Sequence, residues 1–600
     1  MIKLSDYVMK LLAQRGVDTY FTVSGGGIMH LLDSMGTHGG IKYYCNYHEQ
    51  ACAIAAEGWA RVRNRPCGCL ITLGPGAINA ISGIVGAWFD SVPMIVIAGQ
   101  VRRDLIADYS KVRQMGPQEA NTVGVATPVT KYAKTILDPQ MVRYEIEKAY
   151  HLAVSGRPGP VLIDIPLDVQ AAQIDETQLK GFDPAELGEA WSRPEMVQGV
   201  AQALEWLRAA RRPVLVGGTG VRMGDAHELF LELAEKLGLP VVLPYTAKDL
   251  IPESHPLNFG IFGTAGQRRA NFTVQNSDLV LSCASGFSLS KVGFNFKGFA
   301  PKAKKIMVDI DAGQLHNQVI KPDLAVLADV KAFLQELLRQ AEGRALSPSP
   351  KWLPACRHWR ERYPIILPEY FDDQKHVNSY VFMDRLADHL NEGDVFVAGN
   401  GLDCVTYYQS YKVKVGQRSM ISNNWGSMGW DLPLSIGACL GNGRRPTICM
   451  TGDGSIQMNI QELLFLQVHQ LPLKIFIFNN RGYSSIRATQ NAFFKGRFVG
   501  ADPVSGVGNP NFEKLAHAYE IPYFNIKTNA ELDSVITSAL ATAGPAICEV
   551  NLAVEQGITP KASAFTRPDG TIESRPLEDM APFLSREEVF ENMHLCDDEN

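Results

Sequence analysis

The sequence lacks the hydrophobic and basic runs that mark membrane proteins and nucleic-acid-binding proteins. No stretch approaches the roughly 18 consecutive apolar residues that a membrane-spanning helix needs. No dense run of Lys and Arg is present, and 63 acidic residues outnumber 57 basic ones, which gives a net charge of −6. We therefore expect no membrane span and no nucleic-acid partner. Residues 1–18 read as an amphipathic helix rather than as a signal peptide.

Cysteine spacing excludes a second group of proteins. The chain has 11 Cys, an odd number, and its tightest pair, Cys67 and Cys69, is separated by one residue. No Cys-x-x-Cys spacing typical of a zinc or redox site exists. We predict reduced thiols in a cytoplasmic protein. The Gly-x-Gly-x-x-Gly spacing of an NAD-dependent Rossmann enzyme is absent as well.

The chain contains an internal repeat. Three apolar runs recur in the same order in two parts of the chain, at 69–76, 92–98 and 159–165 and again at 447–454, 471–478 and 544–550. The interval from Thr72 to Pro93 equals that from Thr451 to Pro472, at 21 residues. This pattern predicts one α/β domain used twice, although the strand–turn–helix order common to all α/β domains is an alternative explanation.

Length and composition set the domain organisation. At roughly 100–200 residues per domain, 600 residues predict three to five domains, and 46% hydrophobic residues are enough to fill their cores. We expect an α/β protein of three doubly wound parallel-sheet domains, the first and third of the same topology. The expected parts are a first domain at 1–180, a central domain at 190–345, a third domain at 365–555 and a surface tail or lid at 556–600.

The strongest functional pattern lies at the carboxyl ends of two predicted strands of the third domain, where parallel sheets bind ligands. Residues Gly452, Asp453, Gly454 and Ser455 follow the first strand, and 24 residues later Asn479 and Asn480 end the next one. The glycines let the backbone approach a phosphate, and a carboxylate beside a phosphate implies an intervening Mg²⁺. An Asn oxygen from the neighbouring strand can complete the shell of that cation.

With these motifs the sequence resembles the thiamine-diphosphate enzymes of the acetolactate-synthase and pyruvate-decarboxylase superfamily over nearly its whole length. The resemblance implies that Asp453, Asn480 and the carbonyl of Gly482 bind Mg²⁺. It also implies a pyrimidine-binding first domain, a central domain and a diphosphate-binding third domain. In that family the cofactor lies between the first domain of one subunit and the third domain of another, so we expect a dimer or a tetramer.

The resemblance implies a second half-site in the first domain, at residues 47–51. Glu49 matches the family's activating glutamate, which bonds to the aminopyrimidine ring and prepares the thiazolium carbon for reaction. His48 is a candidate for assisting proton transfer, with a structural role as the alternative. Further cofactor-binding positions are implied at Gly26, Thr72, Pro75, Asn79, Asn400, Gly401, Ser427, Met428 and Tyr483. Met428 corresponds to the bulky residue that bends the cofactor into a V. Gly27 and Gln100 match positions that face the substrate, and Gln100 is also a catalytic candidate.

Departures from typical acetolactate synthases concern the second substrate and the flavin. The segment at 284–290 contains no Arg or Asp where the family has an RFDDR-like string, so FAD is doubtful. Residues 217–220 with Asp309 and Asp311 could hold a nucleotide, although a vestigial structure is favoured. No Trp follows the two asparagines. Arg487 and Gln490 occur there instead and are candidates for binding the acceptor, because an Arg binds a carboxylate through two hydrogen bonds.

We therefore expect an enzyme that uses thiamine diphosphate and Mg²⁺ to decarboxylate a 2-oxo acid, with pyruvate as the first choice, and to transfer the acyl-anion equivalent to an acceptor. Its partners are then these small molecules and further copies of the chain. Three alternatives stay open. They are a decarboxylase that releases an aldehyde, a C–C hydrolase of a diketone, and an inactive cofactor-binding paralogue with a structural or regulatory role.

Overall fold

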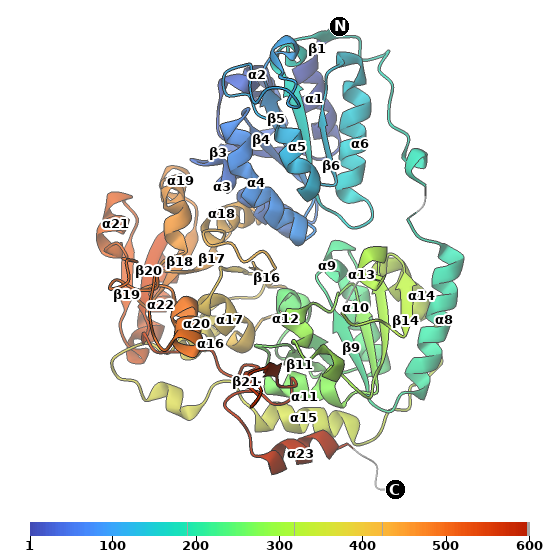
Figure 1. Cartoon of the computed structure of the whole chain (residues 1–600), viewed down its shortest axis with the longest axis vertical. Helices are drawn as coiled ribbons and strands as arrows, with labels where there is room; N and C mark the ends of the chain where they lie inside the picture. The colour runs from blue at the N-terminus through green and yellow to red at the C-terminus, as the bar shows by residue number, and fades with distance from the viewer. Residues whose placement is uncertain (189, 317–318, 423, 597–600) are drawn as a thin grey trace.

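The chain, described by a computed structural model for residues 1–188, 190–316, 319–422 and 424–596, forms three α/β domains with a six-stranded parallel sheet in each. The first domain stands above the other two, which lie side by side (Figure 1). The predicted fold class is confirmed. Among the described residues, no helix is both long and apolar enough to cross a membrane.

The first and third sheets have the same strand order when strands are counted from the start of each domain. The orders are β3-β2-β4-β5-β7-β6 and β16-β15-β17-β18-β20-β19. The first sheet contains β2 (Thr19–Thr22), β3 (Lys42–Cys45), β4 (Cys67–Ile71), β5 (Met94–Gln100), β6 (Tyr132–Thr135) and β7 (Pro160–Pro166). The third contains β15 (Val395–Ala398), β16 (Arg418–Ile421), β17 (Thr447–Gly452), β18 (Leu473–Asn479), β19 (Tyr523–Ile526) and β20 (Ala546–Asn551). The internal repeat is therefore a repeat of topology.

Helices cover both faces of these sheets. In the first domain they are α1 (Leu4–Gln14), α2 (Met29–Thr37), α3 (Glu49–Arg63), α4 (Pro75–Phe89), α5 (Thr122–Ala126), α6 (Val142–Val154) and α7 (Leu167–Gln170), and the short strands β1 (Ile2–Lys3) and β8 (Gln173–Ile174) pair beside them. In the third domain they are α16 (Ser379–His389), α17 (Leu402–Ser410), α18 (Asp431–Gly441), α19 (Leu463–His469), α20 (Ser484–Phe494), α21 (Phe512–Ala518) and α22 (Leu532–Ala541). Central strands such as β4 are apolar throughout because helices bury both of their faces.

The central domain has a different strand order, β11-β10-β9-β12-β13-β14. Its strands are β9 (Pro213–Gly217), β10 (Val241–Leu243), β11 (Asn258–Ile261), β12 (Leu279–Cys283), β13 (Lys304–Asp309) and β14 (Leu324–Leu327). Its helices are α8 (Arg193–Ala209), α9 (Gly220–Met223), α10 (His227–Leu237), α11 (Arg268–Asn276), α12 (Leu289–Val292), α13 (Ala312–His316), α14 (Val330–Gln340) and α15 (Trp352–Arg362). This is the order of dinucleotide-binding sheets, with its switch point between β9 and β12.

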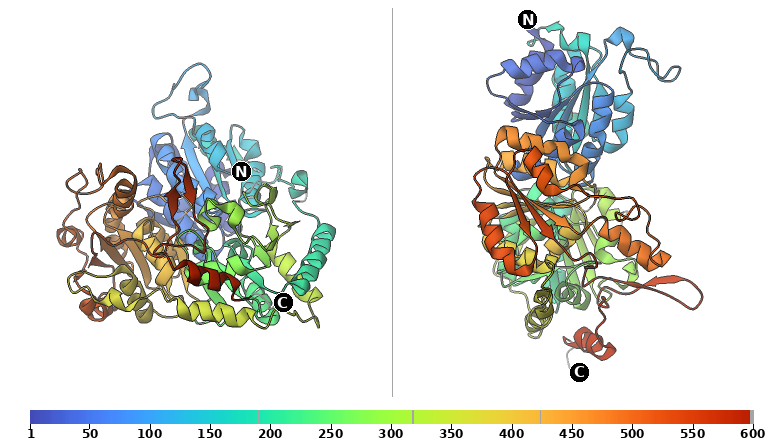
Figure 2. Two further views of the ribbon diagram at one scale, coloured as in Figure 1. Left: turned by 60° about the horizontal axis from the view of Figure 1, so that its bottom comes forward. Right: turned by 90° about the vertical axis from the view of Figure 1, so that its left-hand side faces the viewer.

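The C-terminal residues pack against the central domain. They form the hairpin β21 (Ala564–Thr566) and β22 (Ile572–Ser574) and the helix α23 (Arg586–His594). Asn271 of α11 donates to the carbonyl of Leu577 at 3.0 Å, and the Trp359 indole of α15 donates to Asn592 at 2.9 Å. The hairpin extends from the body of the molecule (Figure 2).

Helices α3 and α18 join the first domain to the third at a very close crossing. A Cβ atom on Gly437 would lie 1.8 Å from the carbonyl oxygen of Ala55, and one on Gly58 would lie 2.2 Å from that of Leu434. Only glycine permits this approach of the two backbones. Because Glu49 begins α3 and the segment around Met428 leads into α18, the crossing fixes the position of both predicted half-sites.

We expect Gly437→Ala to destabilise the fold by about 1–3 kcal/mol, because the added methyl group overlaps the α3 backbone. Gly36→Ala is the matched control, since Gly36 lies in helix α2 with no atom within 4 Å of an added Cβ. Alanine there should leave stability unchanged or raise it by up to about 1 kcal/mol. Urea unfolding followed by circular dichroism measures both variants, and equal midpoints would contradict the close crossing.

Candidate active site

The diphosphate motif lies at the paired ends of two neighbouring strands. β17 and β18 run parallel with Gly452 opposite Phe478, so Asp453 and Asn480 follow at the same edge of the sheet. After Ser455 the chain enters a 3₁₀ helix, Ile456–Glu462. The ring of Tyr483 lies against Gly454, where an added Cβ would be 2.2 Å from a ring carbon.

The residues predicted to bind Mg²⁺ fit a cation. The carboxylate of Asp453 accepts hydrogen bonds from the Gly482 amide at 2.9 Å and from the Asn509 side chain at 2.6 Å. The side-chain oxygen of Asn480 is buried, and among the described residues no donor bonds to it. An unpaired buried amide oxygen is costly unless a ligand or ion completes it. Oxygen ligands of this kind suit Mg²⁺.

Gly482 lies beside Asp453, and its conformation is one that only glycine adopts readily. Its φ is +126°, and an added Cβ would lie 2.5 Å from the carbonyl oxygen of Ala501, so only glycine is accommodated. Among the described residues no group of three or more His, Cys, Asp or Glu side chains could hold a metal ion. A cation here would depend on one carboxylate, an amide oxygen, main-chain groups and the diphosphate itself. Burial raises the pKa of the Asp453 carboxyl.

Three predicted cofactor segments come together beneath this edge. Ser455 accepts from the Gly429 amide at 2.9 Å, which joins the diphosphate turn to the segment that contains Met428. The side chain of Asn400 donates to the carbonyl of Gly426, and Gly401, whose φ is +121°, directly precedes α17. The Ser427 hydroxyl donates to the Met428 carbonyl at 3.1 Å.

The predicted first-domain half-site is also assembled. Glu49 is the first residue of α3, and its carboxylate accepts from Asn79 of α4 at 3.1 Å. A Cβ on Gly76 would lie 2.7 Å from the Thr72 methyl and 2.8 Å from a Glu49 oxygen, so these side chains share one small space. Pro75 starts α4 beside them. The His48 ring accepts from the Gln50 amide at 3.2 Å, a helix-capping contact that accounts for His48 structurally.

The glycine turn of the first domain packs next to this group. A Cβ on Gly25 would lie 2.5 Å from the Thr72 side chain, and one on Gly99 would lie 2.2 Å from the carbonyl oxygen of Gly27. Gly26 has no atom within 4 Å of an added Cβ, so its α-carbon faces open space. This open position is where a ligand could approach the turn.

Three residues predicted to contact the substrate make hydrogen bonds within the protein. Gln100 donates to Asp164 at 3.1 Å and to Ala120 at 3.2 Å, and it accepts from the Val101 amide at 2.9 Å. Its amide group is therefore fully engaged, beside an Asp164 whose pKa burial raises to about 7.

Arg487 and Gln490 hold the loop that follows the asparagines. The Arg487 guanidinium is buried and faces four backbone carbonyls, those of Asn480, Arg481, Ala501 and Val554. Gln490 exchanges two hydrogen bonds with the backbone of Val499, each 3.0 Å long. Both side chains therefore bind the backbone of the loop, Arg487 through its two terminal nitrogens and Gln490 through its amide.

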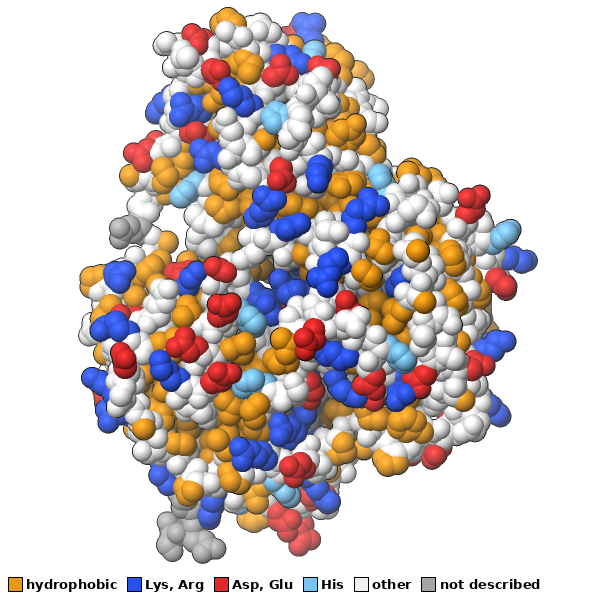
Figure 3. Space-filling view, turned by 180° about the vertical axis from the view of Figure 1, so that it is seen from behind, with side chains coloured by type: hydrophobic (Ala, Val, Ile, Leu, Met, Phe, Trp, Pro, Cys, Tyr) orange, Lys and Arg blue, Asp and Glu red, His pale blue; other side chains and the backbone are white. Residues whose placement is uncertain are grey.

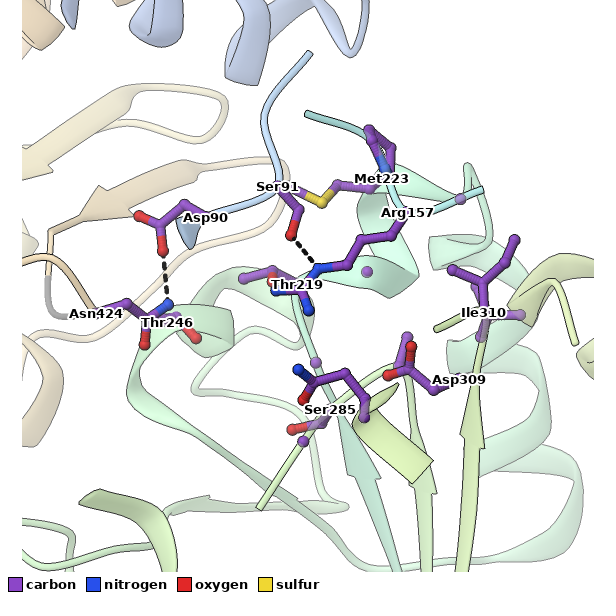
Figure 4. A pocket seen from close by; sticks show the side chains of 18 of the residues that line it. Asp90, Ser91, Arg157, Thr219, Met223, Thr246, Ser285, Asp309, Ile310 and Asn424 are labelled. Atoms are coloured by element: carbon purple, nitrogen blue, oxygen red, sulfur yellow. Dashed lines mark hydrogen bonds between the residues drawn. The ribbon is translucent and has the colours of Figure 1, made fainter. Parts of the chain in front are cut away.

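A separate cavity of about 810 Å³ lies at the carboxyl ends of β9, β12 and β13. In Figure 4 Arg157 donates to Ser91 on one side, and Asn424 donates to Asp90 on the other, at 2.7 Å and 2.6 Å. None of the predicted thiamine residues lines it.

Figure 3 shows Lys and Arg side chains gathered along the hollow where the first domain meets the other two. FAD stays doubtful as a ligand, because the segment at 284–290 that borders the cavity carries neither Arg nor Asp.

Sequence reasoning missed three polar residues of the diphosphate half-site. Asn509 bonds to Asp453 from a loop far along the chain, and nothing in its surroundings marks it. Asp403 and Asp431 are buried in the first turns of α17 and α18. In the sequence, Asp403 follows the predicted cofactor residues Asn400 and Gly401, and Asp431 follows Ser427 and Met428. These positions could have marked both acids as candidates.

Comparison with known proteins finds a match for each of the three domains. The chain matches three family models: the thiamine pyrophosphate enzyme N-terminal TPP binding domain at residues 2–124, the central domain at 200–337 and the C-terminal TPP binding domain at 400–550. It is 30% identical to the acetolactate synthase isozyme 1 large subunit of Escherichia coli over 93% of this chain and 95% of that one. It is 30% identical to the acetolactate synthase large subunit of Lactococcus lactis, with 95% and 96% covered. It is 31% identical to that of Cyanidium caldarium, with 92% and 94% covered.

We expect Asp453→Asn to weaken Mg²⁺-dependent binding of thiamine diphosphate by about 100-fold or more, because the substitution removes the one carboxylate of the cation site. Asp569→Asn, in an exposed turn of the tail, is the control and should bind as the unchanged protein does. Calorimetric titration with and without EDTA measures both. Equal affinities for the two variants would contradict the assignment of Asp453.

Proposed function

Since the chain belongs to the thiamine pyrophosphate enzyme family, we propose that this carboligase decarboxylates pyruvate or a close 2-oxo acid and joins the retained acyl unit to a second carbonyl compound. Two half-sites with intact acid, amide and glycine groups support the proposal. Its main support is that Asp453 and Asn480 follow neighbouring parallel strands at one edge of the sheet, and that no donor among the described residues bonds to the Asn480 side-chain oxygen. The names of its relatives, acetolactate synthases, favour pyruvate and a carbon–carbon bond-forming outcome.

Thiamine diphosphate, when bound, supplies a thiazolium carbon that attacks the 2-oxo carbonyl and accepts the electron pair left by CO₂. The chain's residues hold and activate that group. Asp453, Asn480 and the carbonyl of Gly482 would hold the cation that neutralises the diphosphate, and Met428 would pack against the bound cofactor. Glu49, oriented by Asn79, exchanges a proton with the pyrimidine ring.

The two half-sites are proposed to meet across a dimer. Within one chain, the side-chain hydrogen bond that Glu49 makes is to Asn79 of its own domain. Large apolar side chains are exposed beside both half-sites, Tyr47 at 44% and Ile78 at 39% in the first domain and Met458 at 49% and Ile486 at 43% in the third. Apolar groups exposed around a site commonly mark a surface that a partner covers. No disulfide is formed among the described residues, which supports the proposal of a cytoplasmic location.

We expect the protein with thiamine diphosphate, Mg²⁺ and pyruvate to release CO₂, and Glu49→Gln to lower that rate at least about 100-fold, because the amide cannot exchange the proton. Cofactor affinity should change little. Glu513→Gln, on the exposed face of α21, is the control. A ligated product supports carboligation, whereas acetaldehyde alone would favour the simple decarboxylase. Unchanged CO₂ release by the Glu49 variant would contradict its role.

We expect a mixture of Glu49→Gln and Asp453→Asn chains to regain activity that neither variant has alone. If each site takes Glu49 from one chain and Asp453 from its partner, a mixed dimer contains one intact site. Random mixing then restores about a quarter of the wild-type sites. Co-refolded or co-expressed chains, assayed beside each pure variant, give the result. No gain in proven mixed dimers would show that each chain carries a complete site.

A further inference from the structure

Two buried carboxyl groups meet beneath the diphosphate half-site. Asp403, in the first turn of α17, and Asp431, the first residue of α18, are 1% and 0% exposed. A Cβ on Gly399 would lie 2.4 Å from one Asp431 oxygen and 3.1 Å from one Asp403 oxygen, so both carboxyl groups face the same backbone atom. Gly399 directly precedes the Asn400–Gly401 turn at the end of β15.

Each acid is tied to a different part of the half-site. Asp403 accepts from the Gly399 amide at 2.9 Å. Asp431 accepts from the Ser455 hydroxyl at 2.6 Å, and from the Leu432 amide at 2.9 Å. Because Ser455 accepts in turn from the Gly429 amide, Asp431 connects the diphosphate turn with the Met428 segment. The pair therefore touches all three segments that receive the cofactor.

The two acids are buried together, and each accepts hydrogen bonds from the protein, Asp431 from the Ser455 hydroxyl and Asp403 from the Gly399 amide. Two adjacent buried charges are strongly unfavourable without a cation, and among the described residues no Lys, Arg or His is one of the main groups that shift the pKa of either acid. Burial and the neighbouring Asp431 raise the pKa of Asp403 to about 7. Burial raises the pKa of Asp431 as well, while the Ser455 bond opposes this rise.

We propose that Asp403 and Asp431 are positioning residues that share one proton and hold the diphosphate-binding segments together, and that losing this proton weakens cofactor binding. The proposal rests on the thiamine diphosphate site described above. A second buried negative charge beside the anionic diphosphate repels it and separates the segments that the pair joins. Asparagine at 403 resembles the protonated acid and cannot ionise.

The other titratable groups that face the pair do not supply this behaviour. They are the thiols of Cys404 in α17 and Cys449 in β17. Burial raises the pKa of both thiols, so both stay neutral while Asp403 titrates. The proton that changes near pH 7 is therefore the one held by the two acids.

The test is calorimetric titration of the whole protein with thiamine diphosphate and Mg²⁺ at pH values on either side of 7. The wild type should lose affinity by up to about tenfold for each pH unit above the pKa of the pair, relative to D403N. Titration of the cofactor itself affects both proteins equally, so the difference between them isolates Asp403. Parallel pH profiles for the two proteins would overturn the shared proton.

Two further variants test the link to Ser455. D431N and S455A should each weaken cofactor binding about tenfold, and the double variant should be no weaker than D431N alone, because both changes break one connection. Additive losses would overturn that connection. If D431N does not fold, S455A alone tests the connection, because it leaves both acids in place. If D403N does not fold, D403S replaces it in the pH titration, because serine does not ionise either.

A wild type that binds no thiamine diphosphate at any pH would overturn the proposed function itself. A wild type that binds it with the pH profile of D403N overturns only the role of the acid pair. Circular dichroism and thermal unfolding of each variant confirm that binding is compared between folded proteins.

Discussion

The candidate site depends on the parallel pairing of β17 with β18. Neighbouring parallel strands end at the same edge, and this register alone brings Asp453 beside Asn480, although 26 residues lie between them in the sequence. The loop after β18 is then fixed by the buried Arg487, whose donors face four backbone carbonyls. Among the residues that the structure describes, no donor bonds to the Asn480 side-chain oxygen, so this oxygen can bind a cation.

The repeated topology explains why the chain presents two half-sites and why a close helix crossing joins their domains. The first and third sheets place their functional residues at equivalent edges, Glu49 and Thr72 in one and Asp453 in the other. The α3–α18 crossing holds these domains in one orientation through a contact that tolerates no side chain at Gly437. The central domain contributes a cavity of its own and a surface against which the C-terminal residues pack.

Much of the fold could be predicted from the sequence because its signals are local. Apolar runs followed by glycines gave the strands and their carboxyl ends, and the equal spacing at Thr72 and Thr451 indicated the repeat. The contacts of Gln100 with Asp164 and of Arg487 with Val554 could not be predicted, because these partners are distant in sequence. The meeting of Asp403 with Asp431 could not be predicted either. Each is an unremarkable acid at a helix start until the fold brings both to Gly399.

A crystal structure of the protein with thiamine diphosphate and Mg²⁺ would show whether Asp453, Asn480 and the carbonyl of Gly482 together bind the cation. We expect electron density for one cation within about 2.0–2.1 Å of all three oxygens and of the diphosphate. Density for the cofactor elsewhere, or a cation that does not contact the Asn480 oxygen, would rule out this site.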